Sequence, residues 1–235
     1  MDLEIILYAW ISGFTVFIGG VLSYFFQRYF PSGKEKNEII HFLMAFGGGI
    51  ILSALALVLV PKGLEELDLI PLLMSFSAGA IVFMLLSEYL SKKGGQVAML
   101  MAMLMDYIPE SIALGALFTT NKQSATLLAI FIGLQNLPEA FNSFIELNKN
   151  GIKARKLLFI FFLLGFSGII GAASGLYFLS DLPQVTAHIM IFSSGGIIYL
   201  LFQDIAPGSH MKRSWLPALG ATLGFAVGMI GEKLI

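Results

Sequence analysis

The stretch Met105–Phe141, MDYIPESIALGALFTTNKQSATLLAIFIGLQNLPEAF, holds two similar polar segments inside hydrophobic sequence. The first is Asp106-Tyr107-Ile108-Pro109-Glu110 and the second is Gln135-Asn136-Leu137-Pro138-Glu139. In both, a polar residue, a proline and a glutamate stand at the same offsets. Carboxylates buried in lipid are costly, so acids at such positions indicate a functional site. The rest of the chain is interpreted as the scaffold that holds these residues in a membrane.

The composition is that of a membrane protein. Of the 235 residues, 57% are hydrophobic and 12% are charged, whereas soluble domains average about 25% charged residues. The mean hydropathy is +0.85. Because the chain has no cysteine, thiolate ligands, disulfides and a cysteine nucleophile are excluded. The first residues, Met1-Asp2-Leu3-Glu4, lack the basic region and cleavage site of a signal peptide, so we interpret them as the start of a retained transmembrane helix.

Long hydrophobic segments predict the number of transmembrane helices. About 20 apolar residues span a bilayer as a helix, and eight such segments can be drawn. They run roughly over 4–27, 39–60, 71–91, 97–119, 124–146, 157–179, 184–206 and 214–233. The polar connections are too short to form a soluble domain. We therefore predict an all-α fold, with residues 1–235 forming one polytopic membrane domain built as an eight-helix bundle.

The distribution of Lys and Arg predicts the orientation of the bundle. Of the 14 basic residues, all but Lys62, Lys122 and Lys233 lie in or beside the first, third, fifth and seventh connections. Basic residues are enriched in the cytoplasmic connections of membrane proteins. We therefore expect these four connections in the cytoplasm and both termini on the extracytoplasmic side.

A spacing of four residues places the polar groups of each segment on one helical face. Asp106 and Glu110 share a face of the fourth predicted span. Gln135 and Glu139 have the same relation on the fifth. A short connection makes these helices antiparallel neighbours, so four oxygen-bearing side chains can meet near the middle of the membrane.

Each polar segment also contains a proline that alters the backbone. Pro109 and Pro138 lack an N–H and clash with the carbonyl four residues earlier, which frees the carbonyl groups of Met105 and Leu134. Unpaired backbone at this depth is tolerated only beside protein or water. The two segments therefore predict a buried, partly hydrated cation site.

Electrostatics indicates which partner these acids need. No Lys or Arg lies in the middle of a predicted span, so protons or a cation must compensate the buried carboxylates. A divalent cation is the simplest partner; oxygen ligands favour Mg²⁺, Ca²⁺ or Mn²⁺, whereas imidazole suits Zn²⁺ better. Two alternatives stay open. Protonated carboxyl groups could join two kinked helices, or the acids could relay protons in a carrier of another solute.

Other ionisable groups lie near predicted helix ends. Asp204, beside Gln203 and just before Pro207, is at the cytoplasmic end of the seventh span. It could be a ligand on the exit path of an ion or an interfacial residue, since helix ends admit polar groups. The histidines, at positions 41, 188 and 210, are interpreted as interfacial residues.

At these residues the sequence resembles the ZIP family of divalent-metal transporters, over nearly the whole chain. That family has eight helices with both termini outside. Its fourth and fifth helices carry His-Asn-x-Pro-Glu and a similar His/Gln-Asn/Asp-x-Pro-Glu segment. Asp106, Tyr107 and Glu110 stand at the His, Asn and Glu positions of the first, and Gln135, Asn136 and Glu139 match the second. Val60 to Glu65 is similar to the family's Leu-Pro-x-Ala-x-Glu ending, and Gly196 to Pro207 to its Gly…Asp-Glu-x-x-Pro stretch, with Asp204 in the acidic position.

The departures from the family pattern are informative. Asp106 replaces the usual histidine and the bulky Tyr107 replaces asparagine. The sixth helix normally supplies a glutamate in Ser-Gly-x-x-Glu-Pro, but here Ser167-Gly168-Ile169-Ile170 is followed by Gly171-Ala172. These changes favour one metal site over a two-metal arrangement, and the loss of nitrogen ligands favours Mn²⁺ or Fe²⁺ over Zn²⁺.

The sequence thus predicts a transporter that carries a divalent cation of the Zn, Mn or Fe class into the cytoplasm as its substrate, with no prosthetic group. The expected metal-binding residues are Asp106, Glu110, Gln135, Asn136, Glu139 and Asp204. The resemblance implies a homodimer in the cell membrane, with no nucleic-acid partner. The fourth and fifth helices would move against the others. A metal-binding sensor without transport stays an alternative; an enzyme is disfavoured because no His-Glu-x-x-His motif occurs.

Overall fold

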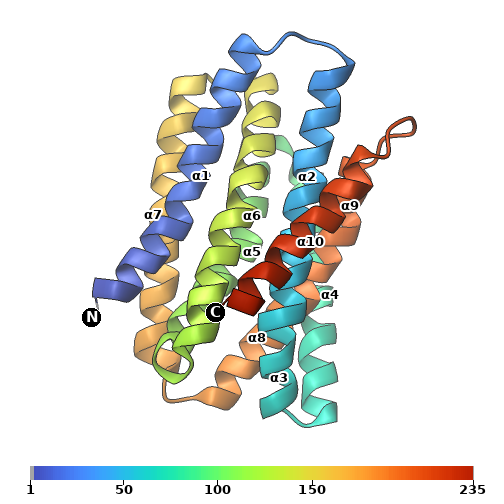
Figure 1. Ribbon diagram of the computed structural model, residues 1–235. Helices are drawn as coiled ribbons and strands as arrows, with labels where there is room; N and C mark the ends of the chain where they lie inside the picture. Colours follow the sequence, from blue (N-terminus) through green and yellow to red (C-terminus); the bar gives the residue numbers. More distant parts are fainter. Residues whose placement is uncertain (1–2, 235) are drawn as a thin grey trace.

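The computed structural model describes residues 3–234, apart from the side chains of residues 96, 98 and 99. The described residues form eight helical rods and no strand (Figure 1). In chain order the elements are α1 Leu3–Tyr29, α2 Lys34–Ala54, η1 Leu55–Leu59, α3 Val60–Glu66, α4 Leu69–Lys93, α5 Gly95–Thr120, α6 Lys122–Lys149, α7 Ala154–Leu179, α8 Pro183–Leu200, η2 Leu201–Ile205, α9 Ala206–Ser209 and α10 Leu216–Leu234. The predicted all-α fold with eight helical segments is confirmed.

Two rods contain a π-helical turn before a proline. Segments α2, η1 and α3 are continuous, as are α8, η2 and α9. Each π-helical turn ends two residues before a proline, Pro61 or Pro207. Because proline cannot donate to the carbonyl four residues earlier, the local helix widens there, and such turns are frequent at functional sites. Pro109 and Pro138, by contrast, lie inside continuous α-helix.

Most of the rods have the length and composition of membrane spans. Among the described residues, six helical segments are long and apolar enough to cross a bilayer: Leu3–Tyr29, Lys34–Glu66, Leu69–Lys93, Leu100–Thr120, Ala154–Leu179 and Pro183–Ser209. Helix α6 falls outside this group, with Gln135, Asn136 and Glu139 near its middle, and so does the shorter α10. The most polar rod therefore has to be shielded from lipid by the others, and its face around the motif is largely buried.

The rods pack as two groups of four. The first comprises α1, α5, α6 and α7; the second comprises the α2–α3 rod, α4, the α8–α9 rod and α10. Within each group, glycines bring helix backbones together. A side chain at Gly115 of α5 would overlap the backbone of Ala172 on α7, and one at Gly49 of α2 would overlap Ala221 on α10. Small residues permit this close approach of membrane helices.

The connections gather at two ends of the bundle. The basic end, defined by the connections around residues 30–33, 94, 150–153 and 210–215, holds the α1–α2 and α9–α10 connections at the top of Figure 1. The terminal end is the opposite one, where α1 begins and the α5–α6 turn lies. Which end faces the cytoplasm stays a prediction from the charge distribution.

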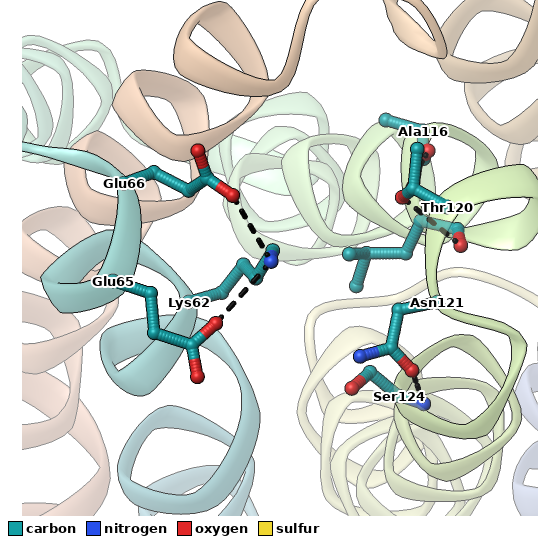
Figure 2. Close-up of polar contacts among 8 residues, drawn as sticks. Lys62, Glu65, Glu66, Ala116, Thr120, Asn121 and Ser124 are labelled. Atoms are coloured by element: carbon teal, nitrogen blue, oxygen red, sulfur yellow. Dashed lines mark hydrogen bonds and ion pairs between the residues drawn. The ribbon is translucent and has the colours of Figure 1, made fainter.

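The terminal end is stabilised by local polar contacts. Figure 2 shows Lys62 between Glu65 and Glu66, with N···O distances of 3.3 and 3.2 Å. It also shows Asn121, whose side-chain oxygen accepts a hydrogen bond from the backbone N–H of Ser124 at 3.0 Å. This contact caps α6, since the first N–H groups of a helix lack partners. The exposed ion pairs contribute less, about 0 to 1 kcal/mol each.

Candidate functional site

The two polar segments meet where α5 and α6 lie side by side. Asp106 and Glu110 are buried on α5, and Gln135 is buried on α6. The amide nitrogen of Gln135 donates a hydrogen bond to Oε2 of Glu110 at 2.5 Å. The predicted convergence of the two segments therefore exists for this pair. Glu139 is half-buried, one turn along α6 from Gln135.

Several oxygen atoms at this position have no protein partner. Oε1 of Glu110 and Oε1 of Gln135 are both buried without a hydrogen bond. The carboxylate of Asp106 has a hydrogen bond from its chain neighbour: its Oδ1 accepts from the backbone N–H of Tyr107 at 2.8 Å. Buried acceptors without donors are unfavourable by about 1–3 kcal/mol each unless a ligand, ion or water satisfies them.

The acids here have no basic partner. Within residues 3–234, the ion pairs involve other acids, and none includes Asp106, Glu110 or Glu139. Glu139 is near enough to Asp106 and to Glu110 for the charges to interact. Like charges in a low dielectric repel strongly, and removing them from water adds a further penalty. The arrangement is therefore suited to a positively charged ligand.

A cavity of about 690 Å³ connects this position with the basic end of the bundle. Asp106, Gln135 and Glu139 line its deep part, and Asp204 lines its mouth. Its walls come from α2, α5, α6 and the α8–α9 rod, which belong to both helix groups. Glu110 lies behind Gln135 rather than on the cavity wall. Asp204 is exposed at the mouth, in the π-helical turn η2.

The cavity has polar wall residues that the sequence analysis did not single out. They are Asn142, Ser143 and Glu146; Gln203, noted in the sequence beside Asp204, lines the same wall. Asn142 donates to the carbonyl of Pro138 at 2.8 Å, and its own Oδ1 is buried without a partner. Three of these residues continue the face of Glu139 at helical spacing, as the sequence 139, 142, 143, 146 shows. This helical spacing was the feature of the sequence that could have identified them as neighbours of Glu139.

Asn136 does not lie with the other predicted ligands. Its amide nitrogen donates to the backbone carbonyl of Ser12 on α1 at 3.3 Å, and it is not among the residues that line the cavity. Among the described residues, no three His, Asp or Glu side chains already converge as a metal-binding group. A bound ion would therefore need the amide oxygen of Gln135, water or small side-chain movements in addition to the carboxylates.

This fold and this site define a class of protein. A bundle of membrane-spanning helices, with uncompensated acids at the end of a long cavity, is typical of a cation transporter. The family model of the ZIP zinc transporter matches residues 87–231. That range covers more than half of the chain and contains both polar segments and Asp204.

The chain belongs to the ZIP zinc transporter family. It is therefore a multi-pass membrane transporter of divalent metal ions rather than an enzyme. The metal is the transported substrate, and members need no prosthetic group. These points agree with the expectations from the sequence. Five points stay predictions: the particular metal, the direction of transport, the ligands, the oligomeric state and the host membrane.

Proposed function

We propose that this transporter carries a divalent metal ion of the Mn, Fe or Zn class into the cytoplasm. The ion would be held by Asp106, Glu110, Gln135 and Glu139, and Asp204 would assist its release. One observation carries the proposal: unpartnered buried oxygens of Glu110 and Gln135 lie beside acids that have no basic partner. A bound cation would give the oxygens an interaction partner and would compensate the charge of the acids.

The donor set supports a preference among metals. Within the cavity wall, the polar side chains are carboxylates, amides and a hydroxyl, with no imidazole among them. Oxygen ligands suit Mn²⁺ better than the nitrogen and sulfur ligands preferred by Zn²⁺. We therefore expect transport of Mn²⁺ or Fe²⁺ to exceed transport of Zn²⁺ at equal concentration.

The shape of the cavity supports release at the basic end. The cavity extends from Gln135 to Asp204, whereas the positions beyond Gln135 on the other side, such as Leu128 and Leu117, are fully buried. Because the basic end is predicted to be cytoplasmic, this conformation corresponds to an inward-open transporter. Transport would require a second conformation that opens toward the terminal end.

The packing supports motion between the two helix groups. Inside each group, glycines such as Gly115 and Gly49 hold helices by backbone contact. Between the groups, Gly47 of α2 faces the side chain of Pro138 on α6, and Gly231 of α10 faces Leu127. Side-chain contacts can slide more readily than interlocked backbones, as in shear motions. Helices α1 and α7 would thus move together with α5 and α6, which enlarges the moving part expected from the sequence.

Flux measurements in proteoliposomes test the proposal. We expect the double variant Glu110→Gln and Glu139→Gln to lose Mn²⁺ uptake, because it keeps the side-chain shapes but removes two negative charges. The matched control is Glu88→Gln, since Glu88 is exposed and pairs with Lys92 on α4. Uptake at the wild-type rate in the double variant would refute the ligand assignment.

The same assay separates the alternatives. A pH-driven flux of another solute in metal-free buffer would identify a proton-coupled carrier. Metal binding without flux would identify a sensor. The homodimer and the cell-membrane location are part of the proposal by family resemblance, and light scattering of the purified protein measures the number of copies.

A further inference from the structure

The two motifs share a second feature, which concerns the residue that follows the first polar position. Asp106 and Gln135 line the cavity, whereas Tyr107 and Asn136 point elsewhere and are each 3% exposed. The Tyr107 hydroxyl donates to the carbonyl of Gly165 on α7 at 3.3 Å. Asn136 donates from its amide nitrogen to the carbonyl of Ser12 on α1 at 3.3 Å. In both motifs the second residue thus bonds to backbone of a neighbouring helix.

The hydrogen bonds of Tyr107 and Asn136 lie close together, where α1 packs against α7. Ser12 and Gly13 are consecutive on α1, and a side chain at Gly13 would overlap both the carbonyl of Gly165 and the Tyr107 hydroxyl. Gly168 of α7 leaves room for the same hydroxyl group. Three glycines on two helices therefore enclose the end of one side chain. This crossing of α1 and α7 is the point on which both motif helices are held.

The anchors are connected directly to the groups proposed to hold the ion. The backbone N–H of Tyr107 orients the carboxylate of Asp106, so a rotation of α5 about its axis moves both. Asn136 follows Gln135 on α6, and adjacent residues of a helix lie about 100° apart. A fixed Asn136 therefore fixes the direction of Gln135, whose amide in turn holds Glu110.

We infer that Tyr107 and Asn136 are positioning residues, not metal ligands, and that they hold the two metal-binding faces of α5 and α6 in register on the Ser12–Gly13 turn. This inference rests on the proposed metal site and assigns a role to residues beside it. It replaces the expectation that Asn136 binds the metal. A ligand must offer an oxygen to the ion, whereas an anchor only has to maintain the distance between two helices.

That difference allows a rescue experiment. An ideal Cβ at Gly133 would lie 3.9 Å from Cβ of Ser12, which is within the range of about 3.5–4.5 Å found in disulfides. The chain has no other cysteine, so within one copy of the protein the pair Ser12→Cys and Gly133→Cys can form only the intended link between α1 and α6. This link lies one helical turn from Asn136.

We expect Asn136→Ala to reduce Mn²⁺ uptake by about two- to tenfold, the range for loss of one hydrogen bond, with a larger change in the maximal rate than in KM. Oxidation of the cysteine pair in the Asn136→Ala background should restore most of the rate, and reduction should abolish the gain. The same pair with Asn136 intact is the control. A link that forms and leaves the control active, yet restores nothing, overturns the inference.

Asn136→Asp provides an independent comparison. A carboxylate keeps two oxygens for a metal but loses the N–H groups that donate to Ser12. The inference therefore requires weaker transport without tighter Mn²⁺ binding, and tighter binding would contradict it. Ser23→Ala is the matched control for α1–α6 packing, because Ser23 donates to the carbonyl of Phe141 and neither residue lines the cavity.

Thermal unfolding in metal-free detergent distinguishes failure of this inference from failure of the proposed function. If wild-type protein neither binds nor carries metal, the proposed function fails. The anchors are then judged by unfolding temperature alone. An anchor requires Asn136→Ala and Tyr107→Phe to lower that temperature, whereas removal of a buried polar group with no structural partner would leave it unchanged or raise it.

Discussion

The two halves of the bundle on either side of Gln135 differ in almost every property. Toward the basic end lies the cavity of about 690 Å³, with acidic and amide side chains on its wall. Toward the terminal end lies an apolar seal of fully buried large side chains. These are Leu55, Leu59, Leu114, Leu117, Leu128, Phe131 and Ile132.

The difference shows how one packed bundle can be closed on one side only. Residues of the seal come from both helix groups, since Leu55 and Leu59 belong to η1 while Leu117 and Phe131 belong to α5 and α6. Opening the terminal side therefore requires the groups to separate along this layer. On the other side the cavity already extends from Gln135 to Asp204, so an ion could leave there without separating the apolar layer.

The largest expected effect is a difference in chemical accessibility. We expect a cysteine at Ser143, on the cavity wall, to react completely with a membrane-impermeant thiol reagent added from the basic end. A cysteine at Ala125, fully buried one turn from the start of α6, should not react from either side. The absence of native cysteines makes each variant a single-site probe, and mass spectrometry measures the labelled fraction.

Addition of Mn²⁺ sharpens this comparison. An ion at Gln135 and Glu139 should slow labelling at position 143 and leave position 125 unchanged. Rapid labelling at position 125 in the metal-free protein would mean that the apolar layer is not a seal.

A smaller effect is expected on stability. Phe131→Ala should lower the free energy of unfolding by about 3 kcal/mol, at the lower end of the range for buried phenylalanine. We expect the lower end because lipid is as apolar as the protein core. The loss of stability then comes mainly from lost van der Waals packing rather than from the hydrophobic effect. Met44→Ala, on the cavity wall, should have an effect below about 1 kcal/mol because that side chain already borders open space. Denaturant unfolding in detergent measures both.

Equal losses in the two variants would argue that the layer around Phe131 is packed no more tightly than the cavity wall. The comparison between the two halves would then rest on polarity alone.

Local properties of the chain predicted the fold well. Runs of apolar residues located all eight rods, and a spacing of four predicted that Asp106 and Glu110 share a face that meets Gln135. The predicted ends were less accurate. Helix α2 begins at Lys34 rather than near 39, because charged residues form a helical turn beyond the apolar run. Hydropathy detects only the part of a helix that lies in lipid.

The parts that depend on distant partners were not predictable. The grouping of helices follows from glycine contacts such as Gly115 with Ala172, and a single sequence does not tell which backbone a glycine will meet. The family pattern indicated a ligand at Asn136, yet its amide points to Ser12 of α1, which lies far away in the sequence.

The smallest expected effect concerns Asp204 at the mouth of the cavity. Asp204 is exposed, and a unit charge in a water-like dielectric interacts with a divalent ion at a separation of about 8 Å, beyond direct coordination, by roughly 1 kcal/mol. We therefore expect Asp204→Asn to slow Mn²⁺ transport by less than about fivefold, an effect that shrinks at high ionic strength because salt screens exposed charges. Asp181→Asn, at a residue that is also exposed but lies on the α7–α8 turn at the terminal end, should leave inward release unchanged. Complete loss of transport in Asp204→Asn, independent of salt, would instead make Asp204 an obligatory ligand and would extend the binding site from the middle of the bundle to the cavity mouth.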